Sequence, residues 1–276
     1  MGVLNVTPDS FSDGGLYAGT EAAVAHAHQM VADGAHILDI GGESTRPATF
    51  SDRSPLPPDE EKRRILPVIT LIAAELPHVP LSVDTYKAEV AEAALAAGAS
   101  LINDISGLTY DPAMASLAAS TGVPVILMHL PGQPRDLPLN PVYTDVVAEV
   151  LAFFERQIDY AEASGILRSQ IWLDPGLGFG KTASHNLELL RRLPELKALG
   201  FPLVVGASRK KFLGRILGTG DPADRRDGTA AAVALSIAGG ADMVRVHDVR
   251  EMARVAKVSD AIVRGWEEQG GRQIRG

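Results

Sequence analysis

The stretch SVDTYKAEVAEAALAAGASLINDISG, residues 82–107, contains a complete strand–helix–strand unit. Its Ala-rich middle has the spacing of an amphipathic helix, and Gly98 stands where such a helix needs a terminal residue able to take positive φ. SLINDI then follows, apolar on consecutive positions, which is typical of a strand covered on both faces in a parallel sheet. This unit therefore predicts an α/β fold.

The same unit recurs along the chain. The candidate helix-ending glycines are Gly34, Gly98, Gly122, Gly165, Gly200 and Gly240, and the apolar runs after them are HILDI, SLINDI, PVILMH, QIWLDP, LVVGAS and DMVRVH. With further strands at Gly2–Val6 and Leu81–Asp84, about eight strands alternate with helices, which predicts a (β/α)8 TIM barrel of ~250 residues. A doubly wound open sheet is the alternative, disfavoured because no G-x-G-x-x-G follows the first strand. We expect residues 1–276 to form one domain, since the Pro-rich residues 54–58 look like a loop.

Composition excludes several classes of function. The 276 residues include 34 acidic and 26 basic side chains, a net charge of −8 that argues against general nucleic-acid binding. Cys is absent, which excludes disulfide scaffolds, Cys-ligated zinc and thiol nucleophiles and indicates the reducing cytoplasm. The N-terminus lacks the basic and apolar regions of a secretory signal, and we expect no membrane span.

A polar residue ends each expected strand. These residues are Asn5, Asp39, Asp84, Asn103, His129, Asp174, Ser208 and His247. Capping of the next helix could explain any one of them, but not polar groups inside buried runs such as SVDT and INDI. Because the carboxyl ends of barrel strands face the active site, the set predicts a polar site there.

The residue types suggest two halves of this site. Asp84, Asn103 and Asp174 supply acceptors for the N–H groups of a flat heterocycle, whereas Arg46, Arg209, Lys210, Arg245 and His247 supply donors for an anion. A nucleotide-like or pterin-like substrate with a diphosphate satisfies both halves. The Gly-rich loop DPGLGFGK, Asp174–Lys181, lacks P-loop spacing. We expect it to form a close backbone turn that lays Phe179 over an aromatic ligand.

Seven motifs in order over nearly the whole chain resemble the dihydropteroate synthase family. They are NVTPDSFSDGG at Asn5–Gly15, GGESTRP at Gly41–Pro47, SVDT, INDISG, DPGLGFGK, ASRK at Ala207–Lys210 and RVHDV at Arg245–Val249. The resemblance implies a TIM barrel with long mobile loops after strands 1 and 2. It also implies an alkyl-transferring enzyme of folate biosynthesis that joins 6-hydroxymethyl-7,8-dihydropterin diphosphate to p-aminobenzoate, with Mg²⁺. Such enzymes are sulfonamide targets and homodimers.

The resemblance also assigns residues. Asp84, Asn103, Asp174 and Lys210 look like the pterin pocket, with Met128 and Phe179 as walls. Asn5, Arg245 and His247 look like the diphosphate side, with Asn5 as metal ligand. Thr45, Arg46, Pro47, Phe11 and Ser208 look like the p-aminobenzoate side. The implied catalytic residues are Asp84, Asp174, Lys210, Arg245 and His247.

The expected mechanism is a dissociative substitution at the pterin methylene, with no covalent nucleophile. A pterin-binding methyltransferase of the same superfamily and a catalytically silent pterin-binding paralogue are the alternatives. The chain departs from the family pattern at Ala48-Thr49-Phe50 after Pro47 and at MHLPGQP, Met128–Pro134, which leaves the role of His129 open. It also begins directly on the first expected strand.

Overall fold

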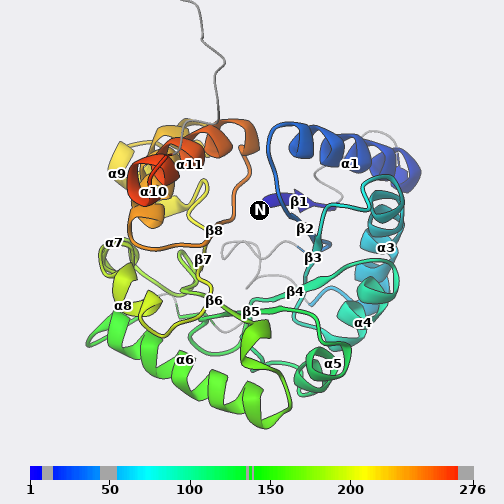
Figure 1. The fold of residues 1–276 in the computed structure, drawn as a ribbon, viewed down its shortest axis with the longest axis horizontal. Coiled ribbons are helices and arrows are strands. Elements are labelled where there is room, and N and C mark those ends of the chain that lie inside the picture. The colour runs from blue at the N-terminus through cyan, green and yellow to red at the C-terminus, as the bar shows by residue number, and fades with distance from the viewer. Residues whose placement is uncertain (8–14, 44–54, 135–136, 139, 267–276) are drawn as a thin grey trace, which may run out of the picture.

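A closed ring of parallel strands forms the centre of the molecule (Figure 1). The structure, a computed structural model, describes the chain except residues 8–14, 44–54, 135–136, 139 and 267–276, so most of each long loop expected after strands 1 and 2 lies outside the described residues. The strands are β1 (Gly2–Asn5), β2 (Leu38–Gly41), β3 (Leu81–Asp84), β4 (Leu101–Asp104), β5 (Val125–Met128), β6 (Ile171–Asp174), β7 (Val204–Val205) and β8 (Met243–Val244).

The connections between strands close the ring. Strands β1 to β6 pair in chain order, and β7 pairs with β8, all in parallel. Parallel bridges from Leu173 to Leu203 and from Gly2 to Val246 join the two sets at both ends. The predicted (β/α)8 barrel is therefore confirmed, and the open sheet is wrong.

Helices surround the strands in chain order (Figure 1). They are α1 (Gly15–Ala32), α3 (Pro58–Glu75), α4 (Ala88–Ala96), α5 (Ala113–Thr121), α6 (Val146–Ala163), α7 (Ala183–Arg191), α8 (Leu193–Lys197), α9 (Lys211–Leu217), α10 (Arg226–Ala238) and α11 (Val249–Arg264), with short 3-10 turns η2 (Arg168–Gln170) and η3 (Ala223–Arg225). Positive φ is confirmed at all the glycines predicted to end helices: Gly34, Gly98, Gly122, Gly165, Gly200 and Gly240. Among the described helices, none is long and apolar enough to cross a bilayer.

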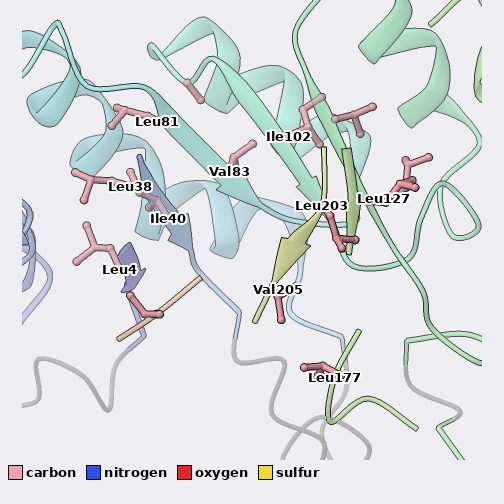
Figure 2. Packing of buried hydrophobic residues seen from close by; sticks show 14 of the residues in the cluster. Leu4, Leu38, Ile40, Leu81, Val83, Ile102, Leu127, Leu177, Leu203 and Val205 are labelled. Carbon is pink, nitrogen blue, oxygen red and sulfur yellow. The ribbon is translucent and has the colours of Figure 1, made fainter. Parts of the chain in front are cut away.

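Alternation along the strands separates two apolar layers. Leu38, Ile40, Leu81 and Val83 are fully or almost fully buried and belong to the large core between strands and helices (Figure 2). A second cluster lies at the end where the strands begin and consists of Met1, Ile37, Leu101, Ile126 and Val204, with Trp172 and Met243. We call this second cluster the plug. Because side chains alternate along a strand, residues two positions after the plug also face the barrel interior, nearer its other end.

A buried ion pair network lies directly after β3. Lys87 Nζ donates to Glu43 Oε2 at 2.7 Å, to Glu61 Oε2 at 2.5 Å and to the Leu56 carbonyl at 2.8 Å. Glu61 is only 1% exposed, and burial raises the pKa of its carboxyl against the attraction of Lys87. Lys87 thus joins the end of β2, helix α3 and the residues that precede this helix.

Removing this cation should be costly. We predict that Lys87→Met lowers the free energy of unfolding by about 3–5 kcal/mol, because two buried carboxylates lose their partner. The double variant Lys87→Met/Glu61→Gln should recover part of the loss. Urea unfolding measures both. Arg191→Met, which removes an exposed pair with Glu188, is the control and should change stability by less than about 1 kcal/mol. If Lys87→Met lowers the free energy of unfolding by no more than Arg191→Met does, the buried ion pairs of Lys87 do not stabilise the fold as we infer.

Candidate active site

Three strands and the end of β8 bring four polar side chains together above the plug. Arg245, directly after β8, donates from Nε to Asp39 Oδ2 and from Nη2 to Asp84 Oδ2, both at 2.6 Å. Asn103 donates from Nδ2 to the same Asp39 oxygen at 3.1 Å. Asp39, Asp84 and Asn103 are at least 92% buried, with exposed fractions of 0%, 8% and 4%. The barrel interior therefore contains a connected polar network instead of a further apolar layer.

Electrostatics keep Arg245 charged, but they disfavour the charged form of Asp84. Burial alone would lower the pKa of Arg245, but the carboxylates of Asp39 and Asp84 outweigh it and raise this pKa. Burial raises the pKa of Asp84 to about 7, although Arg245 opposes the shift. Within the described part of the chain, the buried Oδ1 atoms of Asp39 and Asp84 accept no hydrogen bond. Unsatisfied buried acceptors are costly, so a ligand N–H group is a suitable partner for Asp84.

Asp174 and Lys210 form the second part of the site. Asp174 ends β6, its Oδ1 accepts from the Gly176 N–H at 2.7 Å, and burial raises the pKa of its carboxyl. Lys210 Nζ lies 4.1 Å from the centre of the Phe179 ring, and burial lowers its pKa to about 8. Phe179 belongs to a small apolar cluster with Met128. The predicted apolar walls and polar groups of the pterin pocket thus come from neighbouring elements.

The loop from Asp174 to Lys181 turns as tightly as its glycines suggest. Gly176 has φ +66°, and a Cβ there would lie 2.1 Å from the His129 carbonyl oxygen. Gly178 has φ +81°, and a Cβ there would lie 2.9 Å from Lys210 Cδ. A larger residue at either position would displace the turn or Lys210. Glycine is therefore required at both positions, because the His129 carbonyl and the Lys210 side chain lie too close for a Cβ.

Lys181 binds the backbone of this turn. Its Nζ donates to the carbonyls of Gly176 at 3.0 Å and Phe179 at 3.1 Å, and lies 2.9 Å from His129 Nδ1. Burial lowers the pKa of Lys181 to about 7 and that of His129 to about 2, so the imidazole is neutral. Lys181 is therefore engaged by the loop backbone rather than placed for a phosphate, and His129 contacts this loop through both its ring and its carbonyl.

A hollow of about 440 Å³ lies between β1, α1 and the start of α11, and Asn5, Arg209 and His247 help to line it. Ser208 Oγ accepts from the His247 N–H at 3.1 Å and lies 3.0 Å from His247 Nδ1. Three residues predicted for the anion side therefore line one hollow, whereas Lys210 and Arg245, predicted for the same side, are not among its lining residues. Phe11, Thr45, Arg46 and Pro47 lie outside the described residues.

Comparison with known proteins agrees with this geometry. Residues 1–247 match a family model described as pterin binding enzyme. The chain is 51% identical to the dihydropteroate synthase of Synechocystis sp., over 96% of this chain and 90% of that protein. The chain belongs to the dihydropteroate synthase family.

Solved structures of family members have the same fold. The dihydropteroate synthase of Clostridium difficile, solved in the presence of pteroic acid, superposes with a TM-score of 0.88 at 45% identity and 96% coverage of both chains. The Xanthomonas albilineans dihydropteroate synthase with 4-aminobenzoic acid has a TM-score of 0.87 at 46% identity, covering 95% of this chain and 92% of that one. These similarities favour the synthase over the methyltransferase alternative.

Two features of this dihydropteroate synthase family member differ from the sequence-based grouping. The motifs placed Arg245 on the anion side, whereas its guanidinium contacts Asp84, so it links the two halves of the site. Asp39, one of the polar residues that end the strands, is not among the residues predicted to contact substrate, although its carboxylate accepts from both Arg245 and Asn103. Side-chain alternation within HILDI could have identified Asp39 as a residue of the barrel interior, because it puts Asp39 on the same face as Ile37 of the plug.

The raised pKa of Asp84 predicts pH-dependent pterin binding. A pterin without diphosphate should bind more weakly as the pH falls below 7, by up to about tenfold per pH unit, because protonation removes a charged acceptor. Isothermal titration calorimetry between pH 8 and 6 measures this slope. Asp84→Asn should reduce it, whereas Asp104→Asn, which changes another buried carboxyl with a raised pKa, should not. Equal slopes in all three proteins would contradict this role of Asp84.

Proposed function

We propose that the chain catalyses the dihydropteroate synthase reaction, in which 6-hydroxymethyl-7,8-dihydropterin diphosphate and p-aminobenzoate give 7,8-dihydropteroate and diphosphate. The observation that carries the proposal is the buried Asp84 carboxylate beside Arg245, whose Oδ1 has no hydrogen-bond partner among the residues that the structure describes. An aminopyrimidine edge offers the N–H donors that such an acceptor lacks. The family to which the chain belongs supports the same activity.

The pterin half of the site recognises a flat ring. Asp84 and Asp174 accept from ring N–H groups, and Asn103, held by Asp39, adds an amide. Met128 and Phe179 provide apolar contact with the ring. These carboxylates also stabilise positive charge that develops on the dihydropterin when its exocyclic C–O bond breaks.

The anion half binds the leaving group. Lys210, Arg245 and His247 supply donors for diphosphate oxygens. Among the described residues, no cluster of three or more His, Cys, Asp or Glu side chains could hold a metal ion. Mg²⁺ nevertheless fits a site at Asn5, because it retains water and binds substrate phosphates with few protein ligands. When bound, it neutralises charge on the departing diphosphate.

The substitution requires no covalent enzyme intermediate. The C–O bond at the pterin methylene breaks and its electron pair leaves with diphosphate. The amine nitrogen of p-aminobenzoate then forms the C–N bond, and its surplus proton passes to solvent. Ser208 lies beside His247, and its hydroxyl can reach p-aminobenzoate from there. We propose that it contributes to the p-aminobenzoate side together with Phe11, Thr45, Arg46 and Pro47.

Diphosphate release tests this function directly. We predict release that depends on p-aminobenzoate and Mg²⁺, and a kcat/KM about 10- to 150-fold lower for Asp174→Asn, the equivalent of about 1.5–3 kcal/mol for one charged hydrogen-bonding partner. Arg191→Met, which changes the exposed face of α7, serves as the control and should match the unmodified chain. A chain that binds pterin but releases no diphosphate would instead be the silent paralogue.

We further propose that the chain forms a homodimer in the cytoplasm through α9, α10 and α11, which lie together on one side of the barrel (Figure 1). On α11, Met252 is 1% exposed, whereas Val258 and Ile262 are 60% and 78% exposed. Leu235 of α10 and Ile216 of α9 are also exposed, at 64% and 58%. Exposed apolar side chains gathered on neighbouring helices favour contact with another protein surface.

A charge on these helices should prevent dimerisation. We predict that Leu235→Asp/Ile262→Asp is a monomer in analytical ultracentrifugation at micromolar concentration, where the unmodified chain is a dimer, because an unpaired buried charge is unfavourable. Leu167→Asp changes an equally exposed leucine, 65% exposed, before η2 and should leave the dimer intact. Identical sedimentation of both variants would exclude this interface.

A further inference from the structure

Arg209, between two residues of the candidate site, has an unusual backbone conformation. Its φ is +56°, and among the described residues only Leu108 is another non-glycine residue with positive φ. Left-handed backbone is unfavourable for a residue with a Cβ, and such conformations persist where surrounding contacts hold them. Arg209 follows Ser208, which contacts His247, and precedes Lys210, which lies over Phe179. The backbone conformation of Arg209 therefore sets the directions in which the Ser208 and Lys210 side chains leave the main chain.

Contacts from three other segments hold Arg209. Its N–H donates to Thr229 Oγ1 at 3.1 Å, and its carbonyl accepts from Arg225 Nη1 at 2.9 Å. Its own Nε donates to Asp248 Oδ2 at 2.9 Å, and Nη2 donates to the other carboxylate oxygen. Both backbone groups and the side chain are thus engaged, from η3, from α10 and from the residue after His247.

Arg225 is built into this position. It is 7% exposed, and Nη2 also donates to the Gly220 carbonyl. Gly214 leaves room for it, because a Cβ there would lie 2.6 Å from Arg225 Nε. Burying a guanidinium costs free energy of folding. Its charge-assisted hydrogen bonds to two backbone carbonyls offset part of this cost and fix the path of the local chain.

We propose that Arg225, Thr229 and Asp248 are positioning residues for the reaction. They hold Arg209 in its left-handed conformation, and this conformation directs Ser208 toward His247 and Lys210 toward the pterin pocket. None of the three is among the residues proposed to touch substrate. The inference rests on the proposed function for its kinetic test, but pterin binding provides a second measurement that needs no turnover.

Replacement of Arg209 itself separates backbone conformation from charge. Arg209→Gly and Arg209→Ala both remove the ion pair with Asp248, but only alanine carries the cost of left-handed backbone. We expect kcat/KM and the pterin association constant to be roughly 5- to 30-fold lower for Arg209→Ala than for Arg209→Gly. Equal values for the two variants would overturn the inference.

A second comparison tests the supporting residues. Arg225→Met and the near-isosteric Thr229→Val should lower kcat/KM by about tenfold to a hundredfold, measured well below the melting temperature of each variant. Gln170→Met is the matched control, because Gln170 is also buried and donates to two backbone carbonyls, those of Ala118 and Val123, outside the site. It should lose stability but keep kcat/KM within about twofold.

Two double variants test whether glycine at position 209 restores the activity lost in Arg225→Met. Arg225→Met/Arg209→Gly should be more active than Arg225→Met/Arg209→Ala, because glycine adopts positive φ without support. Arg225→Met with the same kcat/KM and pterin affinity as Gln170→Met would overturn the inference. An unmodified chain that lacks synthase activity would contradict the proposed function, while the pterin affinities of the Arg209 variants would still decide this inference.

Discussion

The buried guanidinium of Arg245 between Asp39 and Asp84 is the interaction on which the site depends. A charge at this depth is stable only with close partners, and two carboxylates provide them. The same contacts link the last strand of the barrel to two early strands, because they join the end of β8 to β2 and β3. They also leave one oxygen of Asp84 without a protein partner in the described structure, so the site is completed by a ligand.

The loops around this network are fixed by contacts of two kinds. In the loop after β6, close approach by the His129 carbonyl and by Lys210 excludes side chains at Gly176 and Gly178. In the loop after β7, Arg209 adopts positive φ although it has a Cβ, and hydrogen bonds from distant segments support it. Both loops end at a lysine: Lys181 binds loop carbonyls, whereas Lys210 lies over Phe179.

Local patterns were sufficient for much of this architecture. The glycine after each Ala-rich segment and the apolar run that follows are local signals, so the barrel and the positive φ of residues such as Gly98 and Gly122 could be predicted. The contacts of Arg245 could not, because they join residues more than 150 positions apart. Positive φ at Arg209 could not be predicted from the sequence either, since it depends on contacts with Arg225 and Thr229 rather than on the residue type of Arg209.

A crystal structure with a bound pterin is the most direct test of the central claim. We predict that the aminopyrimidine edge lies within about 3 Å of the carboxylate oxygens of Asp84 and Asp174, with Arg245 still paired to Asp39. A pterin bound instead in the hollow beside Asn5 and His247, with Asp84 Oδ1 still without a partner, would contradict it.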